Sequence, residues 1–158
     1  MFLDSEAECH EFFEALDALS SQPLKSLRVH PQKRVSGVTF EQEFPELEPV
    51  SWCFNGFRLK SADWPRFQAG AWMGAGVAYV QEAGAMEAVE LLNPKPGELC
   101  LDLCAAPGGK STQILERLQG SGRLLANEFS RARASKLDAL VARHGYLNVD
   151  VTSLDAKV

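Results

Sequence analysis

The chain has 158 residues, of which 46% are hydrophobic, and it carries a formal net charge of −5. This length provides one ordinary domain, or a small domain and part of another, with enough apolar side chains to build a core. The negative charge excludes strong sequence-independent adhesion to nucleic acid, which depends on neutralising phosphates, so any RNA contact has to be local.

The sequence indicates a cytoplasmic protein with no membrane partner. No apolar run reaches the roughly 18 to 20 residues that a membrane helix needs, and the start MFLDSEAECHEFF lacks the basic and apolar regions of a signal peptide. The four cysteines form no C-x-x-C pair. This spacing favours reduced thiols over a disulfide framework and predicts no metal site.

The N-terminal half predicts a small α+β module. Apolar residues from Phe2 to Leu19 recur at helical spacing, and Pro23 ends that helix. Leu24 to His30 alternates weakly, as an exposed strand does, and PVSWCFNGFRL predicts two strands joined by an Asn55-Gly56 turn. The basic stretch from Lys25 to Arg34, with aromatic residues nearby, is typical of a surface that contacts RNA. Packing in a core explains those aromatic residues at least as well.

A helix and a turn then lead into a second unit. Tyr79 to Leu92 carries apolar residues at three-residue steps, which predicts a helix that Asn93-Pro94 ends. The turn from Pro94 to Gly97 is the boundary that we expect between the two parts. The chain thus divides into an N-terminal module over residues 1–78, a linker helix and turn over 79–97, and an α/β unit over 98–158.

The last part of the chain alternates strands and helices. The expected elements are a strand at Leu99–Leu103, a helix opened by Gly108-Gly109 and ending near Leu118, a strand at Arg123–Asn127, a helix from Arg131 to His144 between Ser130 and Gly145, and a strand at Leu147–Thr152. The order β-α-β-α-β implies a parallel sheet with right-handed crossovers. This is one half of a doubly wound nucleotide-binding fold.

The turn CAAPGGKST, from Cys104 to Thr112, lies where such a fold binds its ligand. Its last letters match the P-loop pattern G-x-x-x-x-G-K-[ST], but Cys104 stands where the first glycine of a P-loop belongs. The dinucleotide pattern G-x-G-x-x-G fits no better. A dehydrogenase is therefore disfavoured, and a P-loop nucleotide hydrolase remains only as a distant alternative.

Two carboxylates indicate which ligand the turn holds. Glu128 follows the second strand, 20 positions after Gly108, a separation at which an acidic side chain binds the ribose hydroxyls of an adenosine. A triphosphate would need a metal ion between the like charges. Asp155 lies just beyond the third strand, where a carboxylate accepts a hydrogen bond from the adenine amino group. Together these features favour S-adenosyl-L-methionine.

At these residues the chain resembles a known family. The segments LDLCAAPGGKSTQI, ANEFSRARASKL and VTSLDAKV are similar to the first three cofactor-binding motifs of the Sun family of S-adenosylmethionine-dependent RNA cytosine-5 methyltransferases, closest to its bacterial small-subunit ribosomal RNA members. LRVHPQK, SWCFNGFRL and YVQEAGAM resemble the family's N-terminal RNA-binding region and linker. The resemblance implies a Rossmann-like parallel sheet, the first β-α-β-α-β half of a class I methyltransferase fold, behind a small α+β module, with ribosomal RNA as the partner.

The resemblance also assigns the site residues. It places one group around the methionine part of the cofactor, Glu128 at the ribose and Asp155 at the adenine. The group around the methionine part consists of Cys104, Ala105, Ala106, Pro107, Gly108, Gly109 and Lys110.

The family's catalytic motifs do not occur in this sequence. In the family one cysteine thiolate adds to C6 of cytosine so that C5 accepts the methyl group, and a second cysteine helps to eliminate the first. These cysteines lie in Asp-x-Pro-Cys and Thr-Cys turns, which are absent here. We therefore expect no catalytic residue in this chain, and we expect it to be the cofactor-binding portion of a longer enzyme or a non-catalytic cofactor- or RNA-binding remnant. The strand LCLDL then presents an apolar edge that favours association.

Overall fold

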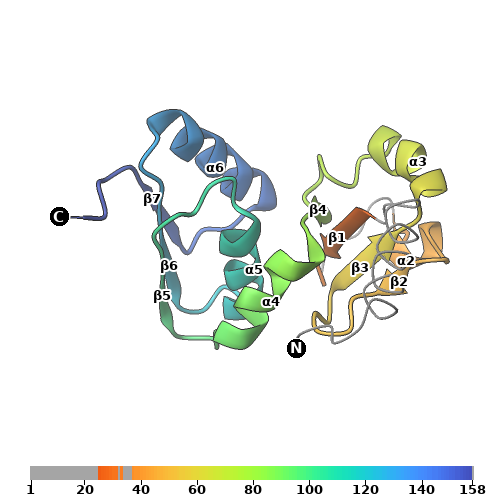
Figure 1. Cartoon of the computed structure of the whole chain (residues 1–158), viewed down its shortest axis with the longest axis horizontal. Coiled ribbons are helices and arrows are strands. Elements are labelled where there is room, and N and C mark those ends of the chain that lie inside the picture. The colour runs from red at the N-terminus through yellow and green to blue at the C-terminus, as the bar shows by residue number, and fades with distance from the viewer. Residues whose placement is uncertain (1–24, 32, 34–36, 158) are drawn as a thin grey trace, which may run out of the picture.

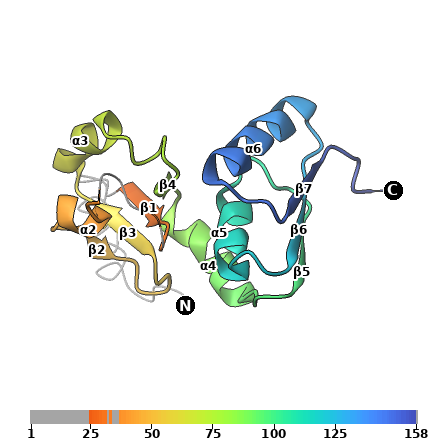
Figure 2. The same cartoon turned by 180° about the vertical axis from the view of Figure 1, so that it is seen from behind.

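The computed structural model describes residues 25–31, 33 and 37–157 (Figure 1). The helix expected between Phe2 and Leu19 lies outside these residues. The described residues form two units, each built on its own sheet (Figures 1 and 2). Within the described ranges, no helix has both the length and the apolar character needed to cross a bilayer.

The N-terminal unit is built on an antiparallel sheet of order β2-β3-β1-β4. Strand β1 (Lys25–Val29) lies between β3 (Gly56–Leu59) and β4 (Ala78–Val80), and the short β2 (Glu48–Pro49) pairs with β3. The strand expected at Leu24–His30 is thus confirmed. Its inner residues are buried, so the expectation of an exposed strand was wrong.

The hairpin expected around Asn55-Gly56 is only partly correct. Its first strand is limited to β2, because residues 50–55 form a loop in which the Cys53 N–H donates to Val50 O and the Gly56 N–H donates to Cys53 O. These local hydrogen bonds replace the strand that the apolar run predicted. Phe54 at the loop tip is 91% exposed.

Aromatic side chains fill the core of the N-terminal unit. Three short helices, α2 (Phe40–Glu43), η1 (Ser61–Asp63) and α3 (Trp64–Ala69), cover the sheet. Phe40 and Phe44 pack edge to face against Trp72, and Phe67 packs edge to face against Phe40. All four rings are buried. Phe67 and Trp72 belong to this core, and the partly buried Trp64 packs against it.

The helix expected at Tyr79–Leu92 was wrong over its first four residues. Helix α4 spans Ala83–Leu92, and Ala78–Val80 is strand β4. Here Val80 pairs with Leu27, and the Gln81 N–H donates to Ser26 O. Apolar residues that recur every three positions could not predict this strand pairing. The pairing depends on β1, which lies about fifty residues earlier in the sequence.

The second unit has the predicted parallel architecture. Strands β5 (Leu99–Asp102), β6 (Arg123–Asn127) and β7 (Val149–Thr152) lie side by side in that order. Helix α5 (Gly109–Leu118) joins the first pair and α6 (Arg131–His144) joins the second. Both helices pack on the face of the sheet that is turned toward the N-terminal unit (Figures 1 and 2).

The opposite face of this sheet carries exposed leucines beside the ion pair of Arg123 and Asp150, and no described residue buries these leucines. Leu99, Leu101 and Leu125 project from it, with 83%, 57% and 42% of their surfaces exposed. Strand β5 is also an edge strand within the described part of the chain. The apolar edge expected of LCLDL is therefore present, and its leucines continue onto β6 at Leu125.

Candidate functional site

The turn from Cys104 to Lys110 joins the carboxyl end of β5 to helix α5, and Asp102 fixes it at both ends. The Cys104 N–H donates to Asp102 Oδ1 over 3.2 Å, and the Ser111 hydroxyl donates to Asp102 Oδ2 over 2.7 Å. The Ala105 N–H donates to Asn127 O over 2.9 Å, which ties the turn to β6. The turn is thus held from both neighbouring strands.

Two glycines shape the turn where α5 begins. Gly108 has a φ of 112°, and a Cβ there would lie 2.4 Å from Cδ2 of Leu140. A Cβ on Gly109 would lie 3.3 Å from Cε1 of Tyr79. Among the described residues no side chain caps α5, so the N–H groups of its first turn are available to a ligand.

A pocket of about 230 Å³ lies between this turn and the chain that connects β4 to α4. Residues 79–82 and Ala85 line one side. The other side consists of turn residues that the sequence singled out: Cys104, Ala105, Ala106, Pro107, Gly109 and Lys110. Gly108 does not line the pocket. The structure thus brings six of the seven predicted turn residues to one pocket.

Glu128 lies at the same edge of the sheet, directly after β6. It is only 4% exposed, and its Oε1 accepts hydrogen bonds from the Ser130 N–H at 3.0 Å and from Arg133 Nη1 at 3.3 Å. Arg133 Nη2 also donates to Ala106 O over 2.7 Å. One guanidinium therefore links the acid to the turn. Glu128 does not itself line the 230 Å³ pocket.

Asp155 lies beyond β7 and is exposed. Its Oδ1 accepts the N–H of Lys157, a contact within its own turn. It does not line the pocket beside the turn. Its role at an adenine therefore stays a prediction.

Sequence reasoning missed the residue that connects the strand ends. Asn127 is 4% exposed, and its Oδ1 accepts the Leu154 N–H at 3.0 Å and the Thr152 hydroxyl at 2.9 Å. Its Nδ2 donates back to Leu154 O over 3.0 Å. Asn127 thus fixes the chain that leads to Asp155. The signal in the sequence was that a polar residue, Asn127, ends the mainly apolar strand RLLAN.

The cysteines differ in exposure. Cys53 is buried, and burial raises the pKa of its thiol. Cys100 is half-buried, and burial raises its pKa as well. Both thiols are therefore poor nucleophiles near neutral pH. Cys104 is exposed beside the pocket, and Cys9 lies outside the described residues.

Comparisons with known proteins identify the chain. The family described as 16S rRNA methyltransferase RsmB/F matches residues 89–158. Over 150 residues the chain is 36% identical to ribosomal RNA small subunit methyltransferase F of Pectobacterium atrosepticum, in a match that covers 89% of this chain and 31% of the relative. The chain belongs to the RsmB/F (Sun) family. It spans about a third of the length of the curated relatives that it matches.

Solved structures agree with this family assignment. A methyltransferase homolog protein from Pyrococcus horikoshii matches with a TM-score of 0.68 and 27% identity, over 84% of this chain and 45% of its own. NSun6 from Pyrococcus horikoshii, solved with SFG, matches with a TM-score of 0.54 and 31% identity, over 57% of this chain and 23% of its own. The Rossmann-like methyltransferase fold expected from the sequence is confirmed.

Proposed function

We propose that this RsmB/F-family chain supplies cofactor binding and RNA binding for methylation of cytosine C5 in small-subunit ribosomal RNA in the cytoplasm. The single observation that carries this proposal is the glycine turn at the start of α5, which borders a pocket and is linked through Arg133 to the buried acid Glu128. The names of the relatives support ribosomal RNA as the substrate.

The cofactor is S-adenosyl-L-methionine, which supplies an electrophilic methyl group when it is bound. The turn residues that line the pocket would hold its methionine part, and Glu128 would accept the ribose hydroxyls. The fit rests on two features. A Cβ on Gly108 would clash with Leu140, and a Cβ on Gly109 would crowd Tyr79 and Gln81 at the pocket. Within the described residues the hydrogen bonds of Glu128 use Oε1, which leaves Oε2 for a ligand. Asp155 is assigned to the adenine by the family's pattern alone.

The N-terminal unit is assigned to RNA. The exposed ring of Phe54 supports base stacking at the loop between β2 and β3, and Trp52, which is 40% exposed, lies in the same loop. Phe57 is partly buried and packs against the core. Arg28 was expected to contact phosphates in the basic stretch, and this was wrong because its side chain is fully buried.

Glu128→Gln is expected to weaken binding of S-adenosylhomocysteine about tenfold, because the amide keeps the contact with the Ser130 N–H but loses the charge that strengthens hydrogen bonds from the ribose. Isothermal titration calorimetry measures this change. Glu87→Gln, an exposed carboxylate on α4, is the matched control and should bind as the wild type does. Binding of ATP in place of S-adenosylhomocysteine would contradict the proposal and favour a nucleotide hydrolase.

Association between copies of the chain is proposed at the uncovered face and edge of β5. Leu101→Lys is expected to shift sedimentation velocity profiles toward the monomer, because a lysine ammonium among the exposed leucines Leu99 and Leu125 must stay hydrated. Folding stability should change by no more than about 0.5 kcal/mol, as for other exposed positions. Leu147→Lys, a 95% exposed leucine outside the sheet, is the control. If the wild type, Leu101→Lys and Leu147→Lys associate equally, the proposal that copies of the chain associate through this surface is refuted.

A further inference from the structure

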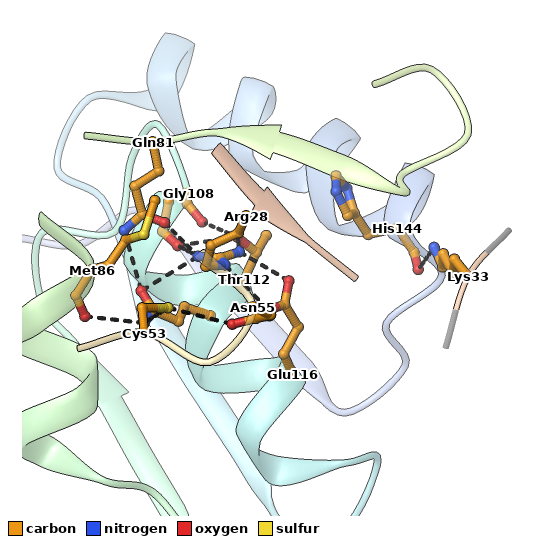
Figure 3. Close-up of polar contacts among 12 residues, drawn as sticks. Arg28, Lys33, Cys53, Asn55, Gln81, Met86, Gly108, Thr112, Glu116 and His144 are labelled. Atoms are coloured by element: carbon orange, nitrogen blue, oxygen red, sulfur yellow. Dashed lines mark hydrogen bonds and ion pairs between the residues drawn. The ribbon is translucent and has the colours of Figure 1, made fainter. Parts of the chain in front are cut away.

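Arg28 lies at the junction of the two units and is fully buried (Figure 3). Its Nε and Nη2 bind the two carboxylate oxygens of Glu116, at 3.1 and 2.9 Å. Its Nη1 donates to Gln81 Oε1 at 2.5 Å and to Gly109 O at 2.7 Å. The second Nη2 hydrogen points to the Thr112 hydroxyl, at 2.9 Å. All five N–H groups of the guanidinium are therefore engaged.

Two of these contacts reach the glycine turn. The bond to Gly109 O is direct. The bond to Thr112 is indirect, because the Thr112 hydroxyl accepts from Arg28 and donates to Gly108 O over 2.8 Å. A side chain of the N-terminal sheet thus holds the carbonyls of both glycines that shape the start of α5.

The guanidinium has little freedom to move. Arg28 lies in β1, which pairs on both sides with β3 and β4. Its partner Glu116 also accepts the Asn55 amide at 2.7 Å, and Asn55 precedes β3. Both the donor and its ionic partner are therefore anchored to the N-terminal unit. The two glycine carbonyls are consequently held in one position relative to that unit.

We propose that Arg28 is a positioning residue that sets the shape of the Cys104–Lys110 turn from the N-terminal sheet, and thereby sets the affinity of the turn for its cofactor. The link to cofactor affinity rests on the proposed function. The positioning of the turn by Arg28 does not rest on the proposed function, because it follows from the hydrogen bonds in the ligand-free chain. Arg28 thus acts on the ligand site although its own side chain does not line the pocket.

Two measurements on the 158-residue chain test the proposal. The first is amide hydrogen exchange without any ligand at position 112, whose N–H donates to Gly108 O. This exchange should accelerate about tenfold in Arg28→Met and several-fold in Thr112→Val, because the turn loses its external donors. The second is calorimetric titration with S-adenosylhomocysteine. Its dissociation constant should rise about tenfold in Arg28→Met, as expected for losing a hydrogen bond from a charged group, and less in Arg28→Lys, which keeps the charge and some of the donors.

Thr112→Val keeps the test decisive if Arg28→Met fails to fold, since it removes only the hydroxyl that links Arg28 to Gly108 O. Arg66→Met, on an exposed arginine of the same unit, should leave both measurements unchanged. Unchanged exchange and unchanged affinity in a folded Thr112→Val or Arg28→Met protein would overturn the proposal. If the wild-type chain does not bind S-adenosylhomocysteine, the proposed function and the link to affinity both fail, and hydrogen exchange alone then decides whether Arg28 positions the turn.

Discussion

Replacement of Arg28 by methionine is expected to lower the free energy of unfolding by about 3–5 kcal/mol. The substitution leaves Glu116, whose side chain is 6% exposed, as a buried charge without its ionic partner. It also removes a donor from Gln81, Gly109 and Thr112. Urea unfolding followed by tryptophan fluorescence measures the loss. Arg66→Met removes an arginine whose ion pairs are exposed to water, and it should cost only a fraction of this.

A double substitution separates the ion pair from the packing of the junction. Arg28→Met combined with Glu116→Met removes both charges, so the loss should be smaller than the sum of the two single losses. Recovery will be partial, because Asn55 and Thr112 remain without their partners. Strictly additive losses would contradict a buried ion pair at this junction.

Gly122→Ala is expected to cost about 3 kcal/mol of folding stability, because backbone strain and a backbone clash add together. Gly122 has a φ of 93°, and a Cβ there would lie 2.3 Å from Glu98 O and 2.9 Å from Glu98 N. These are main-chain atoms of the residue just before β5, and they cannot rotate away. Thermal and urea unfolding measure the loss.

Gly120→Ala provides the matched control two residues earlier. Gly120 has a φ of 75°, and a Cβ added there would meet no atom of the described residues within 4 Å. Only the left-handed backbone strain remains, which costs about 1 kcal/mol. Equal losses at the two glycines would show that the approach of Glu98 to β6 is not the cause.

The second unit could be predicted from the sequence almost element by element. Strand Arg123–Asn127 and helix Arg131–His144 have the predicted bounds, because each depends on local periodicity and on flanking glycine or serine. The start of α5 was equally well predicted from Gly108-Gly109. The turn was predicted to be a ligand site from its sequence motif, CAAPGGKST, and in the structure it borders a pocket.

The junction between the units could not be predicted. Arg28 was interpreted as part of a basic surface, but the partners of its guanidinium lie 53 to 88 positions further along the chain. A sequence pattern over a few neighbouring residues cannot predict contacts between residues so far apart in the chain. The strand at Ala78–Val80 was missed for the same reason, since its assignment depends on β1. Asn127 and Asp102 were interpreted only as strand residues, although their side chains connect strand ends to the turn.

The buried ion pair between β1 and α5 has a consequence for how the molecule loses its structure. Separation of the two units would break the ion pair between Arg28 and Glu116. Each charge would then lose its partner while it still lay among the apolar residues of a folded unit. Partial separation is therefore costly, and full solvation of both charges requires that both units come apart together. We expect the two units to melt cooperatively, in a single transition, despite their separate sheets and separate cores.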